Sequence, residues 1–178
     1  KIARSIGDEE MASQAEAMIA ESSRMIEACY DEERGVYTQA IDSKNLDASL
    51  LQLINMGYLD PHSEKAKQHL AVLEEELRTD SGLFYRYKHI DDFGAPESTF
   101  LICAFWYVEA LARMDRVEEA IQIFEQLLQH GNHLGLLSED VHERSGSQWG
   151  NFPQTYSHVG LINAAFTISR KLDQPVFK

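Results

Sequence analysis

The chain has 178 residues, of which 44% are hydrophobic, so it is large and apolar enough to bury a core and is not disordered throughout. Its 16 Lys and Arg against 29 Asp and Glu give a net charge of −13, which repels the phosphates of nucleic acids and of anionic membranes. A neutral ligand such as a sugar is compatible with this charge.

Three helices are predicted in the first half of the chain. Apolar residues over 11–29 follow the i, i+3, i+4, i+7 spacing of one amphipathic helix face. Residues 46–56 are nearly all apolar and predict a short buried helix. Residues 62–77 place Leu70, Leu73 and Leu77 on one face and charged residues on the other, which predicts an outer, solvated helix.

The second half predicts three more helices. Residues 98–113 are apolar almost all round, as expected of an inner helix, and 116–130 are again amphipathic with Gly131 as a stop. Residues 156–172, rich in apolar and small side chains, predict another buried helix. No stretch alternates clearly enough to predict a sheet, although 84–90 could form a short strand.

This alternation of amphipathic and buried helices favours helical hairpins in which an outer ring covers an inner one. Long connections (31–45, 78–97, 131–155) follow the amphipathic helices, and if neighbouring helices run antiparallel these loops emerge at one end. A solenoid of tetratricopeptide-like helices is the rival architecture, because 116–130 resembles one such helix. No 34-residue period is repeated, however, which favours a closed toroid.

Two loops carry the candidate site residues. In 78–97, Arg86 stands between Tyr85 and Tyr87, with Phe84, Phe93 and Glu97 nearby; these side chains suit a sugar-binding surface, but composition alone favours a structural ion pair of Arg86 and tyrosines that only pack. In 131–155, the carboxylates of Glu139, Asp140 and Glu143 precede Trp149, Phe152, Tyr156 and His158. Glycoside hydrolysis needs two carboxyl groups. A solvated acidic loop is the better interpretation for Asp140 and Glu143, whereas for Glu139 the two interpretations are even.

Other chemistry has little support in the sequence. The seven histidines form no HExxH, and His130 and His133 straddle a helix end, so we expect no metal and no cofactor. No glycine-rich phosphate loop follows a strand. Cys29 and Cys103 lie in apolar helical patterns and are expected to be reduced, which with the lack of an apolar signal segment predicts a cytoplasmic location.

Five blocks, in order along the chain, resemble the C-terminal half of the catalytic domain of glycoside hydrolase family 15, the glucoamylase, glucodextranase and bacterial trehalase-like family: LDASLLQLINMGYLDP, LRTDSGLFYRY, ESTFLICAFWYVEALARMDRVEEAIQIFEQLL, GLLSEDV and GNFPQTYSHVGLINAA. The resemblance covers essentially all of residues 1–178. It implies an all-α fold, about half of an (α/α)6 barrel, and an inverting hydrolase acting on α-linked glucosides.

The resemblance also implies roles for individual residues. Glu139 matches the general base, and Arg86 with Tyr87 matches a pair whose arginine holds sugar hydroxyls. Phe100 falls where fungal relatives have an active-site tryptophan, and Glu97 begins the same block as in bacterial relatives. Trp149 is a further candidate for sugar stacking. The QWGNFPQTYSH block is more similar to the trehalase and dextran-cleaving branch than to fungal starch enzymes, which leaves the linkage open.

No segment resembles the block that carries the family's general acid, which belongs upstream of this chain. We therefore expect the chain alone to be inactive, because an unprotonated leaving oxygen costs roughly 10²- to 10⁴-fold in rate. Its open faces are expected to pack against the missing half of the domain or against a second copy. The alternative is a helical scaffold that performs no chemistry.

Overall fold

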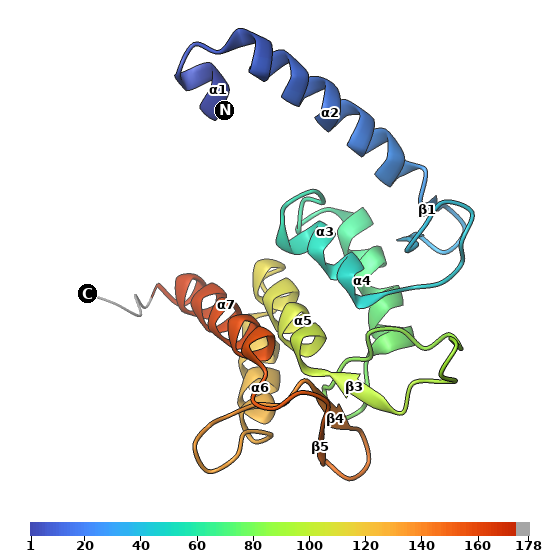
Figure 1. The fold of residues 1–178 in the computed structure, drawn as a ribbon, viewed down its shortest axis with the longest axis vertical. Coiled ribbons are helices and arrows are strands. Elements are labelled where there is room, and N and C mark those ends of the chain that lie inside the picture. Colours follow the sequence, from blue (N-terminus) through green and yellow to red (C-terminus); the bar gives the residue numbers. More distant parts are fainter. Residues whose placement is uncertain (174–178) are drawn as a thin grey trace.

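The computed structural model describes residues 1–173 and consists mainly of helices joined by loops and very short strands (Figure 1). In chain order the elements are α1 (Ile2–Ser5), α2 (Glu9–Glu27), β1 (Tyr30–Asp31), β2 (Val36–Tyr37), the 3₁₀ helix η1 (Ala48–Leu51), α3 (Gln52–Asn55), α4 (Glu64–Leu77), β3 (Ser98–Phe100), α5 (Leu101–Arg113), α6 (Val117–Leu128), β4 (Asp140–His142), β5 (Gln148–Trp149) and α7 (Thr155–Lys171).

Helix α5 is the centre of the core, as its uniformly apolar sequence predicts. Ten of its 13 residues are buried, and it packs against η1, α3, α6 and α7. Helices α4 and α6 are amphipathic and cover this centre. The buried side of α4 includes Leu70, Leu73 and Leu77, which confirms the face predicted from their spacing. An inner helix covered by outer helices is therefore present in this part of the molecule.

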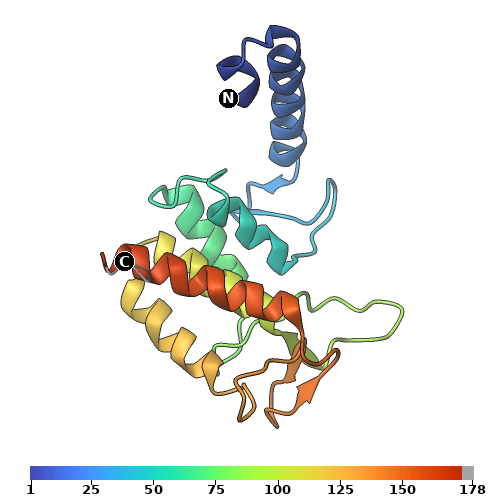
Figure 2. The same cartoon turned by 60° about the vertical axis from the view of Figure 1, so that its left-hand side comes forward.

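Helix α2 does not bury the face that its apolar spacing predicts. The arm formed by α1 and α2 stands away from the rest of the molecule (Figures 1 and 2), and Ala12 is the one residue of α2 that is buried. Met18 and Ile19 are 71% and 64% exposed. The spacing correctly predicts a helix, but most of this face is exposed among residues 1–173, and Ile26 near its C-terminal end packs against the core.

The arm is attached to the body at the C-terminal end of α2. Glu27 accepts hydrogen bonds from the hydroxyls of Tyr37 (2.7 Å) and Tyr58 (2.8 Å), and it forms an ion pair with Lys65 at 3.0 Å. These four residues are called the Glu27 anchor below. Three donors converging on one carboxylate hold the pKa of Glu27 below its usual value, with the Tyr37 hydrogen bond as the largest cause.

Helix α7, predicted to be a buried helix, is buried on one face only. Its small residues Ser157, Gly160 and Ala164 face the core, and Gly160 lies so close to α5 that a Cβ there would be 2.5 Å from Ile102. The opposite face exposes Val159 and Ile162 by 44% and 50%. The prediction of burial from small residues at helical spacing is therefore correct for the face of α7 that packs on α5.

The structure differs from the prediction in its strands. Residues 84–90 form no strand, and Ser98–Phe100, predicted as the start of a helix, form β3 in the three-stranded antiparallel sheet β3–β4–β5. A second small sheet pairs β1 with β2. Strands of two or three residues are too short to show alternation. The predicted helix over 46–56 likewise divides into η1 and α3.

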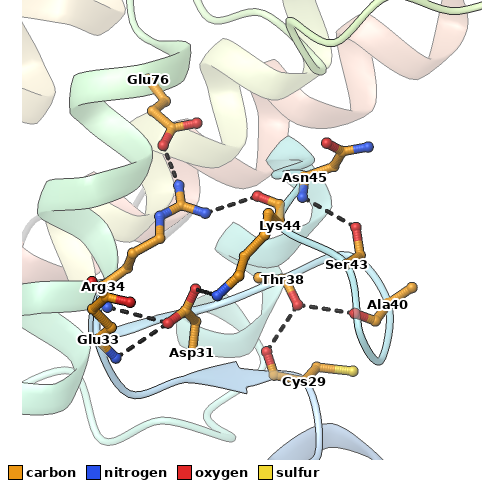
Figure 3. Close-up of polar contacts among 10 residues, drawn as sticks. All are labelled: Cys29, Asp31, Glu33, Arg34, Thr38, Ala40, Ser43, Lys44, Asn45 and Glu76. Atoms are coloured by element: carbon orange, nitrogen blue, oxygen red, sulfur yellow. Dashed lines mark hydrogen bonds and ion pairs between the residues drawn. The ribbon is translucent and has the colours of Figure 1, made fainter.

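Of the three long loops, 31–45 lies beside α4, whereas 78–97 and 131–155 lie near the N-terminal ends of α5 and α7 (Figures 1 and 2). Polar contacts hold the first of them against α4 (Figure 3). Asp31 accepts hydrogen bonds from the backbone N–H groups of Glu33 and Arg34 and pairs with Lys44 at 2.7 Å. Arg34 in turn donates to the carbonyl of Lys44 and pairs with Glu76. These contacts therefore fix the 31–45 loop to itself and to α4.

Candidate active site

A hollow of about 580 Å³ lies on the loop side of the molecule and is lined by Arg86, Tyr87, Phe93, Pro96, Ser98, Phe100, Glu139 and Asp140. It is called the Glu139 hollow below. The two loops predicted to carry the site thus meet in space although about 50 residues separate them. Its size is suited to a sugar-sized ligand.

The sheet β3–β4–β5 directs several of these side chains to one side. Phe100 pairs with Asp140, and Asp140 pairs with Trp149, so the three side chains project from the same face of the sheet. Thr99 and Val141 project from the other face and are fully buried. The sheet therefore fixes Phe100 and Asp140 beside the hollow while it anchors itself in the core.

Glu139 is held from two directions by its backbone. Its carbonyl accepts a hydrogen bond from the N–H of Leu101, the first residue of α5, at 3.0 Å, and its N–H donates to the carbonyl of Asn151 at 3.0 Å. The flanking Ser138 is buried, and its carbonyl accepts the hydroxyl of Ser157 at 2.8 Å. The segment around Glu139 is thus clamped between the beginnings of α5 and α7.

The carboxylate of Glu139 is held as well. Its Oε2 accepts hydrogen bonds from the backbone N–H of Asn151 (3.0 Å) and from the Asn151 side-chain amide (2.8 Å). The preceding Gly150 has φ +75°, and a Cβ on it would lie 2.8 Å from the same oxygen. Glycine is therefore required here both for the backbone conformation and for the close approach of Glu139.

Asp140 is more than a solvated acid beside Glu139. It is half-buried and accepts a hydrogen bond from the hydroxyl of Ser98 at 2.7 Å. Burial raises the pKa of Asp140, and the neighbouring Glu139 carboxylate adds to this rise, whereas the Ser98 hydrogen bond acts against it. Two carboxylates with different hydrogen-bond partners, Asn151 for Glu139 and Ser98 for Asp140, thus line the same hollow.

Arg86 forms an ion pair and also lines the hollow. Its Nε donates to Oδ2 of Asp47 at 3.3 Å, and its carbonyl accepts the N–H of Ala48 at 2.7 Å. The Arg86 side chain is still 60% exposed, so its guanidinium has donors available for a ligand. Tyr87 is half-buried beside it and donates its hydroxyl to Asp91.

Two other predicted site residues lie outside the Glu139 hollow. Glu97 is exposed and lines a neighbouring hollow of about 360 Å³ together with Tyr85, Pro96, His142, Glu143 and Arg144. There the Tyr85 hydroxyl donates to Glu143 at 2.8 Å, and burial raises the pKa of Tyr85 to about 12. Trp149 is 55% exposed and stacks on His142, with ring centroids 6.3 Å apart. Pro96 forms the wall shared by the two hollows.

Residues 1–173 show neither a metal-binding cluster nor a membrane-spanning helix. No three His, Cys, Asp or Glu side chains in this part of the chain are placed to hold a metal ion. None of its helices combines the length and apolar character that a membrane span requires. Cys103 is buried and Cys29 is half-buried, and both are free thiols.

Sequence reasoning did not single out Asp47 and Asn151, the two residues that orient Arg86 and Glu139. Asp47 precedes η1 and accepts the N–H of Ser49 at 2.8 Å, so the sequence signal it gives is that of a helix N-cap. Asn151 follows a glycine in a loop, a pair of residues that indicates a turn. Neither pattern indicates which distant side chain the residue contacts.

The sequence is similar to known proteins. The model of the family described as glycosyl hydrolases family 15 matches residues 1–166. A trehalase of Thermoplasma volcanium is 39% identical over 86% of this chain, and a trehalase of Mycobacterium tuberculosis is 36% identical over 96% of it. The chain spans only 24% and 25% of these two relatives.

Solved structures show the same fold. A bacterial glucoamylase complexed with acarbose matches with a TM-score of 0.77 and 18% sequence identity, over 98% of this chain and 32% of that one. A wild-type glycosidase matches with a TM-score of 0.71 and 20% identity, over 92% of this chain and 46% of that one. The predicted all-α fold, part of an (α/α)6 barrel, is confirmed by this likeness.

Proposed function

Because the chain belongs to glycosyl hydrolases family 15, we propose that it supplies the general base and part of the sugar-binding surface of an inverting α-glucoside hydrolase. The observation that carries this proposal is that Glu139 and Arg86, 53 positions apart by their residue numbers, line one hollow of about 580 Å³. An ionisable carboxylate and a guanidinium beside aromatic rings are the groups that water activation and polyol binding require.

In the proposed reaction Glu139 takes a proton from a water molecule while the water oxygen attacks the anomeric carbon. The bond from that carbon to the leaving oxygen breaks on the opposite side, and a second carboxyl group protonates the leaving oxygen. Arg86 holds hydroxyl groups of the glucosyl ring, and Phe100 and Tyr87 border it. Glu97 and Trp149 lie beyond this hollow, so we assign them to contacts with the part of the substrate that leaves.

The second carboxyl group comes from outside this chain in our proposal. Asp140 is the other carboxyl in the hollow, but it adjoins Glu139 in sequence and is bonded to Ser98, so it lies on the side of the base. An inverting enzyme needs its two carboxyl groups about 6.5 to 9.5 Å apart, across the sugar. We assign the acid to the remainder of the family domain, which would face the hollow.

The remainder of the domain is also the proposed partner of the exposed apolar faces. Met18 and Ile19 on α2 and Val159 and Ile162 on α7 would be covered by it. We call this chain together with that remainder, on one polypeptide or two, the assembled domain. A second copy of the chain is the competing partner, and size-exclusion chromatography with light scattering on the chain, with and without the remainder, separates the two outcomes.

The relatives named trehalase make trehalose the first substrate to test. We expect the assembled domain to hydrolyse trehalose in preference to maltose, isomaltose and soluble starch, and the chain alone to hydrolyse none of them. Release of β-glucose, followed by NMR in the first minutes, would establish inversion. Activity of the chain alone would contradict the assignment of the acid, and an inactive assembled domain would favour a non-catalytic scaffold.

The decisive variant is Glu139→Gln in the assembled domain. Removing the base should lower kcat by about 10³-fold or more, with little change in the melting temperature, because Gln keeps the size of Glu. Glu125→Gln is the matched control, since Glu125 is exposed on α6 and lines neither hollow. Equal activity of the Glu139→Gln variant and the wild type would reject the proposed role.

A further inference from the structure

We infer that Asn151 is a positioning residue for Glu139: its side-chain amide fixes Oε2 of the carboxylate so that Oε1 is the oxygen presented to the attacking water. This inference rests on the proposed function, because it assigns Asn151 a role only if Glu139 is the base. Three hydrogen bonds join the two residues, one from the Glu139 N–H to the Asn151 carbonyl and two from Asn151 to Oε2.

The three contacts make a closed link between backbone and side chain. The main-chain bond at 3.0 Å sets the two segments side by side, and the Asn151 N–H and Nδ2 then reach the same oxygen at 3.0 and 2.8 Å. A carboxylate oxygen only accepts, so the amide nitrogen must be the group that faces it. Among the described residues, every donor that reaches this carboxylate approaches Oε2.

Such a link selects between the two oxygens of the base. A glutamate side chain has three rotatable bonds, and a base that samples many rotamers spends little time aligned with the water. With Oε2 bound twice, the carboxylate plane is fixed and Oε1 keeps its lone pairs for the proton. Misplacement of a reacting group by about 1 Å typically costs a hundredfold in rate.

Gly150 makes the link possible by leaving space for it. A Cβ at this position would lie 2.8 Å from Oε2 and 2.9 Å from Cβ of Glu139, which is closer than real Cβ contacts come. Gly146 in the same hairpin also has a positive φ, +66°, but a Cβ there would meet nothing within 4 Å. Alanine at either glycine would strain the backbone, but only alanine at Gly150 would also collide with the Glu139 side chain.

The link is tested first by kinetics of the assembled domain with substitutions at Asn151. We expect Asn151→Ala to lower kcat about ten- to hundredfold while KM stays within about twofold, because the base acts in the transition state and not in sugar binding. Asn151→Asp keeps the shape but places a like charge beside Glu139, so its kcat should be lower still. A residue that only filled space would tolerate Asp better than Ala, and that order would overturn the inference.

Gly150→Ala and Gly146→Ala form the second kinetic pair. Both variants bear the strain of alanine at a positive φ, but only Gly150→Ala pushes the Glu139 carboxylate from its place. We expect kcat of the Gly150 variant to fall at least tenfold below that of the Gly146 variant. Equal kcat values would show that the position of Oε2 does not matter.

A measurement on the chain itself does not depend on activity. The ¹H–¹⁵N signals of the Asn151 side-chain amide should shift in Glu139→Ala and stay in place in Glu143→Ala. Unshifted signals in Glu139→Ala would show that the link is absent and would overturn the inference. If Glu139→Gln is inactive but Asn151→Ala is fully active, the inference fails and the proposed function stands; if Glu139→Gln is active, the proposed function fails and the inference with it.

Discussion

Arg86 donates a hydrogen bond from Nε to Oδ2 of Asp47 over 3.3 Å, so an exposed guanidinium is oriented by an aspartate side chain that is only 13% exposed. We expect Asp47→Asn to lower kcat/KM of the assembled domain about tenfold. A charge-assisted hydrogen bond of this kind contributes about 1.5 kcal/mol, and the loss of that free energy from the transition state lowers kcat/KM by about a factor of ten. Steady-state kinetics with trehalose would measure the loss.

Asparagine is chosen at this position because it keeps the N-cap of η1. Oδ1 of Asp47 accepts the N–H of Ser49, and an asparagine oxygen can accept it as well. The melting temperature of Asp47→Asn should therefore stay close to that of the wild type. A large fall in melting temperature with unchanged kcat/KM would mean that Asp47 serves the fold and not the orientation of Arg86.

The Glu27 anchor predicts how firmly the α1–α2 arm is attached. Glu27→Gln removes the charge that Tyr37, Tyr58 and Lys65 share, and since Glu27 is half exposed we expect a loss of no more than about 1 kcal/mol. Hydrogen exchange of the α2 amides should become faster by up to about fivefold. Glu21→Gln, which removes an ion pair with Arg24 on the same helix, is the control and should change exchange less.

The anchor should also respond to acid in a defined direction. The pKa of Glu27 is lowered in the folded chain, so its contribution is fully present above the usual value of 4.5 and is lost as the pH falls through the lower folded value. Limited proteolysis of the arm should accelerate at acidic pH in the wild type. The same acceleration in Glu27→Gln would show that another group is responsible.

His69 predicts a second pH dependence, this time of the core. It is fully buried, its Nδ1 accepts the Tyr37 N–H at 3.2 Å, and its Nε2 lies 3.1 Å from the Leu50 carbonyl, an arrangement that needs the neutral ring. Burial lowers the pKa of His69 from 6.5 to about 4. The free energy of unfolding should therefore fall by roughly 3 kcal/mol as the pH falls from about 6.5 to 4.

Chemical denaturation at several pH values would measure this slope, and NMR of the His69 ring would assign it. A free energy of unfolding that is constant over this range, or a His69 ring that protonates near pH 6.5, would contradict the prediction.

The two thiols should differ in reactivity. Cys103 is fully buried in α5, and burial raises the pKa of its thiol, which disfavours the reactive thiolate. Cys29 is half-buried. We expect one thiol per chain to react with an aromatic disulfide reagent under native conditions and two in denaturant, and none under native conditions in Cys29→Ser. Rapid reaction of Cys103 in the folded chain would contradict the packing of α5.

The helices could be predicted from the sequence because their apolar spacing extends over many residues. The all-apolar α5 and the leucine face of α4 lie as their patterns indicate. The exposure of α2 and of one face of α7 could not be predicted, because periodicity shows that a face is apolar but not whether anything covers it. The two-residue strands left no periodic signal at all.

The site was less accessible to sequence reasoning than the fold. Family resemblance pointed to Glu139 and Arg86, whereas loop composition alone did not decide for either, and both residues line one hollow. The partners Asp47 and Asn151 were not found, since a hydrogen bond across 39 residues, or a glycine that leaves space for a carboxylate, has no local pattern. The separation of Glu97 from Glu139 depends on the path of the loop, which composition does not specify.

The bond from the Leu101 N–H to the Glu139 carbonyl joins a loop residue to the first turn of the most deeply buried helix. An amide in that position is freed by cooperative opening of the core and not by fluctuation of the loop. The loop around residue 139 therefore stays ordered for as long as α5 stays folded. Heat or denaturant should abolish the alignment of this carboxylate in the same transition that melts the helix, with no earlier step.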